Sequence, residues 1–544
     1  MEAISGNIVN IPSEKIFQGL IHIDGDLIHS IEIVSENTDP ALPYIIPGFT
    51  DSHVHIESSM LVPSEFARLA VVHGTVATVS DPHEIANVCG LDGVRFMIDN
   101  GGQVNFKFCF GAPSCVPATA FETSGASIDA AGVRELLDLS EIPYLSEMMN
   151  FPGVINEDPE VVAKIVAAKA AGKPVDGHAP GLRGEALRKY VAAGISTDHE
   201  CFTEEEAREK LGLGMKILIR EGSAAKNFEA LIGLLHEFPE QIMFCSDDKH
   251  PDSLVKGHIN TLCERAVNKG IPLFNILRAA CINPVVHYGL SNGLLRQGDQ
   301  ADFILVEDLK SYRVTATYIR GTCVARDGAS LIKTLPVGAI NHFKCRAINA
   351  ETLSSPASTQ LIDGRLPVIE SIDGELITRK LSFEPSLDGD LVIADPDRDI
   401  LKIVVVNRYR PSPPAVAFIR NFGIKRGALA SSVAHDSHNI IAVGTNDDFL
   451  AAAINMIIEK QGGVSAVSDQ DSKILPLPVA GLMSAENGYE VARAYTEIDA
   501  MIKSMGSTLS APFMTLSFMA LLVIPALKLS DLGLFDGDEF RFVH

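Results

Sequence analysis

The sequence predicts an α/β fold: a (β/α)₈ TIM-type barrel, a small β-sheet domain built from both flanks of the barrel, and a C-terminal α+β domain. Three observations support this prediction. Eight short apolar runs alternate with amphipathic stretches in the middle of the chain. Regions that alternate apolar and polar residues lie on both sides of them, and the pattern changes again after about residue 340. At 544 residues, the chain is also too long for a single hydrophobic core.

The two flanks alternate apolar and polar residues in runs such as KIFQGLIHIDGDLIHSIEIV and RVTATYIRGTCVARDG. This period of two is typical of strands that bury one face. The turn Asp24-Gly25-Asp26 lies between two such runs, as in an antiparallel hairpin. We therefore expect one small β-domain, assembled from residues 1–45 plus 296–338.

Residues 46–295 follow a different pattern, in which short apolar runs precede helical stretches such as DPEVVAKIVAAKAAG and NFEALIGLLHEFP. The eight runs occupy residues 44–53, 74–83, 104–113, 142–149, 172–180, 194–200, 215–223 and 241–248. Strand-then-helix units repeated in this way over about 250 residues are typical of a (β/α)₈ barrel. The pattern predicts that fold for residues 46–295.

Residues 339–544 are predicted to form a separate α+β domain. The segments ESIDGELITRK and GDLVIADPDRDILKIVVVNRY favour strands, and DDFLAAAINMIIEKQGG favours a helix that ends at Gly462. The apolar run 512–527 is shorter than the ~20 residues that a membrane-spanning helix needs, and it contains Pro512 and Pro525. We expect a buried helix there rather than a membrane span.

The composition excludes several classes of function. The net charge of −24 and the lack of a Lys/Arg block argue against nucleic-acid binding, because phosphates would be repelled. Nine scattered cysteines indicate a reducing compartment rather than a disulfide framework. The segment MEAISGNIVN lacks the basic start and apolar core of a signal peptide. We expect a cytoplasmic enzyme with no nucleic-acid or membrane partner.

Polar residues at the carboxyl ends of the predicted strands form the candidate site, because barrel enzymes place their chemistry there. In GFTDSHVHIESS, His53 and His55 point to the same face of a strand and so converge on one spot. Taken alone, such a pair could merely hydrogen-bond its neighbours. The full set of candidate ligands at strand ends is His53, His55, Glu147, His178, His199 and Asp247. Together they indicate a metal site.

This ligand set fits two metal ions better than one, because four histidines and two carboxylates exceed what one tetrahedral zinc needs. Glu147 lies between the first histidine pair and the two later histidines around the barrel, where a carboxylate can bridge two cations. A metal pair lowers the pKa of a shared water and orients it for attack on an electrophilic carbon. Asp247 could contact one metal and accept the proton of that water.

Other metal and phosphate motifs do not fit the sequence. HEIAN (83–87) begins like a helical zinc-protease motif, but Asn87 stands where the second histidine is required. The sequence also lacks the Pro-Cys-x-x-Cys pattern of zinc nucleobase deaminases and a Walker-type glycine loop. These classes are therefore excluded.

Several segments carry a resemblance that covers almost the whole chain: GFTDSHVHIESS, DPHEIANVCG, EMMNFPG, DGHAPGL, STDHE, FCSDDKHPD and FGIKRGALASSVAHDSHNIIAVGTND. With them the sequence resembles the adenine deaminases of the amidohydrolase superfamily. The resemblance implies hydrolysis of adenine to hypoxanthine and ammonia, in purine salvage, at a dinuclear Mn²⁺ or Fe²⁺ centre. Zn²⁺ would also suit the ligand types. Glu147 takes the place of the carboxylated lysine that bridges the metals in many superfamily members.

The same resemblance suggests a mechanism. A metal-activated hydroxide would attack C6 of adenine, and Asp247 would pass its proton to the departing amine. Ring atom N1 then needs a donor, for which His83 and Glu84 are the candidates. His83 could instead only hydrogen-bond a metal ligand. Arg220 and Ser223, at the end of the run 215–223, are candidates for substrate contact.

Other features leave alternatives open. His435 and His438 in SVAHDSHNII are expected to lie in a hydrogen-bonded loop, or to help close the active site if this segment approaches the barrel. An N-acetyl sugar-phosphate deacetylase of the same superfamily and a non-catalytic metal-binding homologue are the alternative functions. The size and the superfamily favour a homo-oligomer, with a dimer as the expected state.

Overall fold

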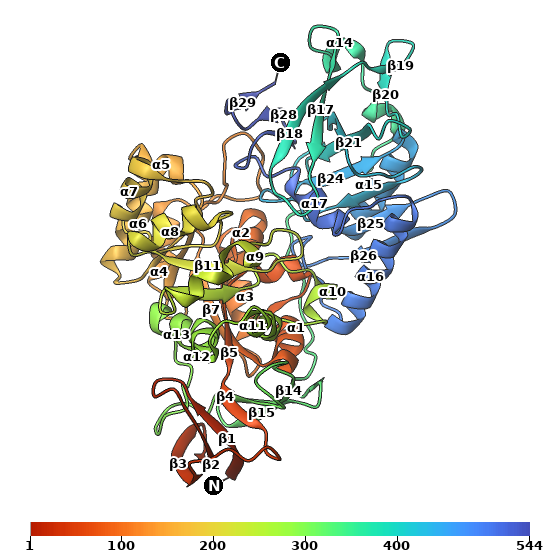
Figure 1. The fold of residues 1–544 in the computed structure, drawn as a ribbon. Coiled ribbons are helices and arrows are strands. Elements are labelled where there is room, and N and C mark those ends of the chain that lie inside the picture. Colours follow the sequence, from red (N-terminus) through yellow and green to blue (C-terminus); the bar gives the residue numbers. More distant parts are fainter. Residues whose placement is uncertain (1, 544) are drawn as a thin grey trace.

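Eight parallel strands form the predicted barrel in the computed structural model, which describes residues 2–543 (Figure 1). The strands are β5 (Phe49–Val54), β6 (Thr75–Ser80), β7 (Lys107–Ala112), β8 (Tyr144–Met148), β9 (Val175–Gly177), β10 (Thr197–Asp198), β11 (Lys216–Arg220) and β12 (Ile242–Cys245). Strands β5 to β9 pair in chain order, and so do β10 to β12. Each strand overlaps one of the eight predicted runs, so the predicted fold class is confirmed.

Two narrow contacts close the barrel. A parallel bridge between Val175 and Ile195 joins β9 to β10, and another between Val54 and Asp247 joins β5 to the end of β12. At the second contact, the carboxylate of Asp51 accepts hydrogen bonds from the backbone N–H and the hydroxyl of Ser246. This carboxylate fastens the last strand of the barrel to the first, so the ends of β5 and β12 lie side by side.

Helices surround the barrel in the expected alternation. They include α1 (Pro63–Ala70), α2 (His83–Cys89), α3 (Leu91–Gly101), α4 (Ala130–Leu137), α6 (Pro159–Ala170), α7 (Gly184–Ala192), α8 (Glu204–Gly212), α9 (Phe228–Leu231) and α11 (Ile259–Asn268). Local sequence explains where several of them start. Asp129 and Asp158 cap α4 and α6 by accepting hydrogen bonds from N–H groups of the first turn, and Thr203 caps α8.

One eight-stranded sheet contains strands from both flanks, in the order β16-β15-β14-β13-β4-β1-β2-β3. Its strands are β1 (Glu2–Asn10), β2 (Lys15–Asp24), β3 (Leu27–Ser35), β4 (Tyr44–Pro47), β13 (Phe303–Val306), β14 (Val314–Ile319), β15 (Thr322–Arg326) and β16 (Ala329–Ser330). The chain passes from β4 to the barrel at Gly48, where a Cβ atom would lie 2.3 Å from a methyl carbon of Val76. We propose residues 1–45 plus 296–338 as one domain, although β4 extends past its boundary.

The C-terminal domain, residues 339–543 of the described chain, contains a second eight-stranded sheet in the order β18-β17-β22-β21-β24-β23-β25-β26. Its strands are β17 (Leu366–Ser371), β18 (Thr378–Phe383), β21 (Leu401–Val406), β22 (Ala415–Arg420), β23 (Ala428–Ser431), β24 (Ile440–Gly444), β25 (Gly463–Val467) and β26 (Ser472–Pro476). Helix α15 (Asp447–Lys460) is the predicted helix and ends at Lys460, two residues before the expected Gly462. Helix α16 (Gly488–Ser504) follows it.

The apolar run 512–527 differs from its prediction as one buried helix. Only α17 (Pro512–Phe518) is helical, and the chain then turns into β27 (Leu527–Ser530), which pairs with β28 (Gly533–Asp536). The prediction overestimated the helix because residues 519–526, where the chain turns, contain no polar residue to mark the turn. Among residues 2–543, no helix combines the length and the apolar character needed to cross a membrane.

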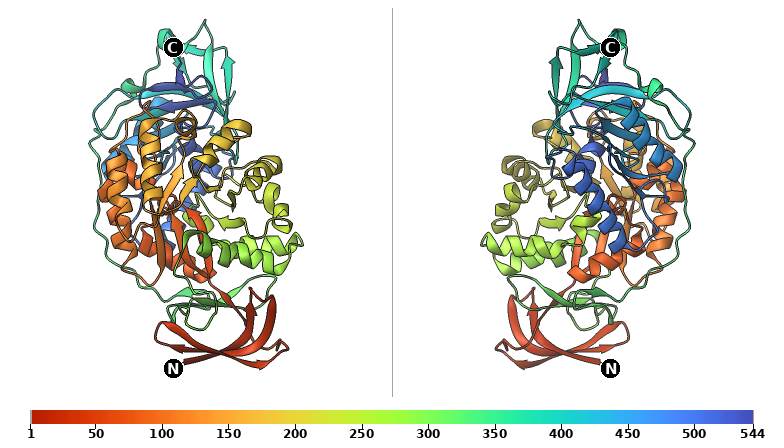
Figure 2. Two further views of the ribbon diagram at one scale, coloured as in Figure 1. Left: turned by 90° about the vertical axis from the view of Figure 1, so that its left-hand side faces the viewer. Right: turned by 90° about the vertical axis from the view of Figure 1, so that its right-hand side faces the viewer.

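The C-terminal domain covers the end of the barrel opposite the small β-sheet (Figures 1 and 2). An extended segment, residues 331–349, runs along the side of the barrel and connects the two (Figure 2). Hydrogen bonds dock the domain on the barrel: the N–H of Ser484 donates to the carbonyl of Met60, and the N–H of Gly488 donates to Glu65 Oε2, both at 2.8 Å. The carboxyl ends of the barrel strands therefore face another domain rather than solvent.

Candidate active site

All six predicted ligands meet at the carboxyl end of the barrel. His53 lies in β5 and Glu147 in β8. The other four come just after strands: His55, His178 and His199 directly follow β5, β9 and β10, and Asp247 lies two residues beyond β12. None is more than 6% exposed: His53, His55, Glu147, His178, His199 and Asp247. Their positions in the chain range from residue 53 to residue 247, and the barrel brings them to one place, as the order of the strands predicts.

The ring nitrogens of the histidines are arranged as in a metal site. His53 Nε2 and His55 Nε2 lie 3.1 Å apart. His55 Nδ1 lies 3.3 Å from the carbonyl oxygen of Asp81, so Nδ1 carries the proton and Nε2 has a free lone pair. His178 Nε2 is buried and has no hydrogen-bond partner among residues 2–543. Buried imidazole lone pairs that face one another are stabilised by a cation between them, so these residues fit a metal centre.

Glu147 has the geometry of a bridging carboxylate. Its Oε1 lies 3.3 Å from His55 Nε2, while its Oε2 lies 2.7 Å from His178 Nδ1 and 3.2 Å from His199 Nε2. The two oxygens therefore face different histidines. Burial raises the pKa of Glu147, but the neighbouring histidines outweigh it and hold the pKa well below its usual value. The ionised carboxylate can contact two cations at once.

Asp247 is oriented by an arginine. Its Oδ1 lies 3.3 Å from His55 Nε2, and its Oδ2 pairs with Arg220, which also donates to Glu200 Oε2 at 2.8 Å. Asp247 has a φ of 53°, a conformation that costs about 1–3 kcal/mol in a residue other than glycine. Burial raises the pKa of Asp247, but Arg220 holds it well below its usual value. The structure thus fixes one carboxylate oxygen toward the ligand cluster.

The two residues predicted to contact substrate have different surroundings. Arg220 lines the cavity, but its guanidinium is engaged by Asp247 and by Glu200, a residue that the sequence did not single out. Ser223 is not among the lining residues. Its hydroxyl accepts a hydrogen bond from the N–H of His250 at 2.8 Å and lies 3.2 Å from the hydroxyl of Ser253. The structure therefore does not bring Ser223 to the cavity.

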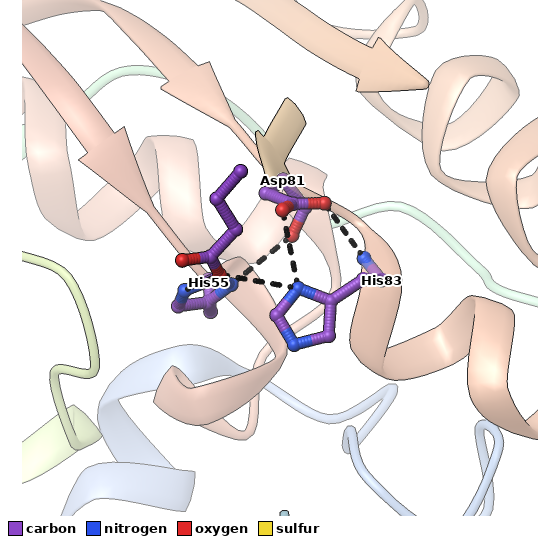
Figure 3. Close-up of side chains that lie close together, drawn as sticks. His55, Asp81 and His83 are labelled. Atoms are coloured by element: carbon purple, nitrogen blue, oxygen red, sulfur yellow. Dashed lines mark hydrogen bonds and ion pairs between the residues drawn. The ribbon is translucent and has the colours of Figure 1, made fainter. Parts of the chain in front are cut away.

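His83 lies at the start of α2, beside the ligand cluster. Figure 3 shows the rings of His55 and His83 beside Asp81. His83 Nδ1 lies 3.1 Å from Asp81 Oδ2 and 3.5 Å from Glu147 Oε1, and Nε2 lies 3.4 Å from Glu84 Oε1. Burial lowers the pKa of His83, but Asp81 and Glu84 outweigh it and raise the pKa well above its usual value. The ring therefore lies at the edge of the cavity among carboxylates that stabilise its protonated form.

The His435–His438 segment of the C-terminal domain reaches the barrel and contacts Glu84. His435 Nδ1 lies 2.5 Å from Glu84 Oε1, and His438 Nε2 pairs with Glu84 Oε2. His438 Nδ1 accepts a hydrogen bond from the N–H of Ala434 at 3.1 Å, so the ring proton must be on Nε2. Nε2 then donates to Glu84 and has no lone pair for a metal. Both expectations for this segment hold: it is a hydrogen-bonded loop, and it closes the site.

A cavity lies between the barrel and the C-terminal domain. Its floor contains ligands of the cluster, and Leu376, Phe518 and Leu521 of the C-terminal domain form an apolar roof above them. Apart from Met149, the remaining lining residues are polar and include His83, Glu84, Glu200, Asp248, His435 and Asp436. An apolar wall with a few convergent polar groups is typical of a small-molecule site.

A single lysine connects two parts of the roof. The ammonium group of Lys528, in β27, donates to the carbonyl of Leu376 at 2.5 Å and to that of Phe518 at 2.8 Å. Lys528 is fully buried, and this burial lowers its pKa from 10.5 to about 7. The unfolded chain returns the side chain to water, where its pKa is about 10.4.

This difference predicts a pH dependence of stability. Between about pH 7 and pH 10 the unfolded state binds more protons at Lys528 than the folded state does, so stability contributed by Lys528 rises with pH and is lost as pH falls toward 7. In Lys528→Met this contribution is missing. We expect the thermal unfolding midpoint of the wild type, minus that of Lys528→Met, to increase from pH 7 to pH 9.5. The surface variant Lys503→Met should follow the wild type, and a pH-independent difference for Lys528→Met would contradict the assignment.

Comparisons with known proteins agree with this geometry. The amidohydrolase family model matches residues 44–324, and the model of the adenine deaminase C-terminal domain matches residues 375–541. An adenine deaminase of Salinibacter ruber is 54% identical over 99% of this chain and 98% of its own length. One of Methanosarcina barkeri is 51% identical over 100% of this chain and 99% of its own length.

A solved β-aspartyl dipeptidase from Fervidobacterium islandicum covers 60% of this chain and 98% of its own, at 17% identity and a TM-score of 0.45. The two family models together span the barrel and the C-terminal domain that meet at the cavity. The identity to the curated relatives extends over the full length of both proteins. The chain therefore belongs to the adenine deaminase family, with the barrel of the amidohydrolase family.

Proposed function

We propose that this protein hydrolyses adenine to hypoxanthine and ammonia, in purine salvage. One observation carries the proposal: six buried histidines and carboxylates meet at the end of the barrel, and five of them line a cavity that lies under an apolar roof. The full-length adenine deaminase relatives agree with it. A flat heteroaromatic base suits a cavity of this kind, because apolar side chains cover its faces while polar groups contact its edges.

The six ligands would hold two divalent cations, with Glu147 between them. We propose Mn²⁺ from the family membership, while the mixed histidine and carboxylate set also suits Fe²⁺ or Zn²⁺. When bound, the metals supply a water of lowered pKa for attack on C6 of the base. His55 is kept in the required tautomer by the carbonyl of Asp81.

The chain's own residues would then move two protons. Asp247, oriented by Arg220, accepts a proton from the attacking water and delivers it to the departing amine. His83 donates to ring atom N1, which must gain a proton as C6 changes from planar to tetrahedral. Glu84 is the less suitable donor, because both its oxygens are engaged by His435 and His438. We assign Glu84 the role of positioning these two rings.

The deacetylase alternative has weaker support. An N-acetyl sugar phosphate needs a cationic group for its phosphate. Arg220 is the one lysine or arginine among the described residues that line the cavity, and two carboxylates already engage its guanidinium. The expected homodimer and the cytoplasmic location remain predictions.

Release of ammonia tests the proposal. Purified protein is incubated with adenine, adenosine, cytosine and N-acetylglucosamine 6-phosphate, each with Mn²⁺ and after removal of metal with a chelator. We expect ammonia from adenine alone, in the metal-loaded protein alone. Acetate release from the sugar phosphate would favour the deacetylase, and no product from any substrate would favour a non-catalytic metal-binding protein.

A further inference from the structure

Two adjacent residues of the C-terminal domain present polar atoms to the cavity that have no partner. His435 Nε2 and Asp436 Oδ2 are buried, and neither has a hydrogen-bond partner in the part of the chain that the structure describes. Each residue is 3% exposed, and both line the cavity. Buried polar atoms almost always have a hydrogen-bond partner. Two buried atoms without one, side by side at a binding cavity, therefore indicate a ligand that supplies the missing hydrogen bonds.

The two atoms have opposite hydrogen-bonding character. His435 Nδ1 donates to Glu84, and Nε2 lies 3.8 Å from Asp248 Oδ1, a charge contact that is too long for a hydrogen bond. Burial lowers the pKa of His435, but the carboxylates of Glu84 and Asp248 outweigh it and raise the pKa to about 9, so Nε2 also carries a proton. Asp436 has Oδ1 at 3.7 Å from His83 Nε2, which leaves Oδ2 as a free acceptor. The C-terminal domain thus places one donor and one acceptor side by side.

Adenine has a matching edge. An attacking water approaches C6 along the normal to the ring, so one face of adenine lies over the cavity floor and the edges of the base meet the cavity walls. N3 is the ring atom opposite C6; it accepts hydrogen bonds, and the neighbouring N9–H donates one. This edge, the one farthest from the reacting carbon, therefore matches the donor and acceptor that the C-terminal domain presents to the cavity.

We propose that His435 donates to N3 of adenine and that Asp436 accepts from N9–H, so that the C-terminal domain recognises the edge of the purine opposite the reacting carbon. This inference rests on the proposed function and deepens it. It makes the free base the substrate, because a substituent at N9 removes the donor and meets Asp436. It also explains why the family joins a second domain to a barrel that already carries all six ligands.

The test for Asp436 compares adenine with 9-methyladenine, which has no N9–H. In Asp436→Ala we expect kcat/KM for adenine to fall about 100-fold, whereas kcat/KM for 9-methyladenine does not fall, since the wild-type protein makes no such bond to it. The ratio of kcat/KM for adenine to kcat/KM for 9-methyladenine should therefore fall about 100-fold. An equal loss on both substrates would show that Asp436 is only structural and would overturn the proposal. Asp436→Asn keeps an amide oxygen that can accept from N9–H, so it should retain part of the preference that Asp436→Ala loses.

The test for His435 follows the same logic with 3-deazaadenine, which lacks the N3 acceptor. His435→Ala should lower kcat/KM for adenine and leave that for 3-deazaadenine unchanged, relative to the wild type. His438→Gln is the matched control, because His438 contacts Glu84 as well but does not line the cavity. His438→Gln should change kcat/KM for adenine and for 3-deazaadenine by the same factor. An equal change for both substrates in His435→Ala would refute the N3 contact.

Two further measurements separate the possible failures. Metal content and the thermal unfolding midpoint of each variant should match those of the wild type, which shows that the substitution has not disrupted the metal site on the cavity floor. A wild-type protein that releases no ammonia from adenine would refute the proposed function itself. A wild-type protein that is active on adenine and equally active on 9-methyladenine would leave the proposed function intact and refute this inference.

Discussion

Asp247→Asn is expected to lower the turnover of adenine about 10²–10⁴-fold while the protein keeps part of its metal. The amide has nearly the shape of the carboxylate, so Arg220 and His55 retain a neighbour of the right size. It cannot accept a proton from the attacking water, and it carries no charge to pair with the buried guanidinium. The rate at saturating adenine and the metal content per chain check this result.

A matched control for this variant is Asp252→Asn, which makes the same substitution in the short helix α10 (Pro251–Leu254), five residues further along the chain. Asp252 is not among the residues that line the cavity. We expect it to keep the wild-type rate and metal content. If Asp247→Asn also turned over adenine at nearly the wild-type rate, Asp247 would have no part in proton transfer.

Glu147→Gln is expected to lower both the metal content and the turnover. The two oxygens of Glu147 face different histidines, whereas the amide nitrogen of glutamine donates and cannot bind a cation. We expect at most one bound metal per chain and a loss of turnover of about 1,000-fold or more, equivalent to about 4 kcal/mol of transition-state stabilisation. Elemental analysis after gel filtration and a steady-state assay measure the two effects together.

The control here is Glu141→Gln. Glu141 is exposed and precedes β8 at the end of the strand remote from the ligands. This variant should bind metal and turn over adenine as the wild type does. A Glu147→Gln protein with two metals per chain would show that Glu147 is not the bridge, whatever its rate.

The barrel and the meeting of the six candidate ligands at one end of it could be predicted from the sequence for a physical reason. Parallel strands buried on both faces are near-continuous apolar runs, and the residue after each run must emerge at one end of the barrel. His53, His178 and His199 therefore meet although more than a hundred residues separate the first from the others. Strand order alone, without any side-chain geometry, brings them together.

The parts that depend on packing between domains were not predicted. The spacing of SVAHDSHNII does not show which barrel loop it meets, so the pairing of His435 and His438 with Glu84 emerged only in the structure. Arg220 was correctly placed at a strand end, but its partners were unknown. Glu200 directly follows a ligand in STDHE, and this position was the available signal that it also lies at the site.

The central claim is that two cations share one site on this chain. It is tested most directly by adding Mn²⁺ to metal-free protein and measuring, in the same samples, bound metal by elemental analysis and ammonia release from adenine. We expect activity to rise until two ions are bound per chain and to remain constant beyond that point. Full activity with one ion per chain would contradict the account.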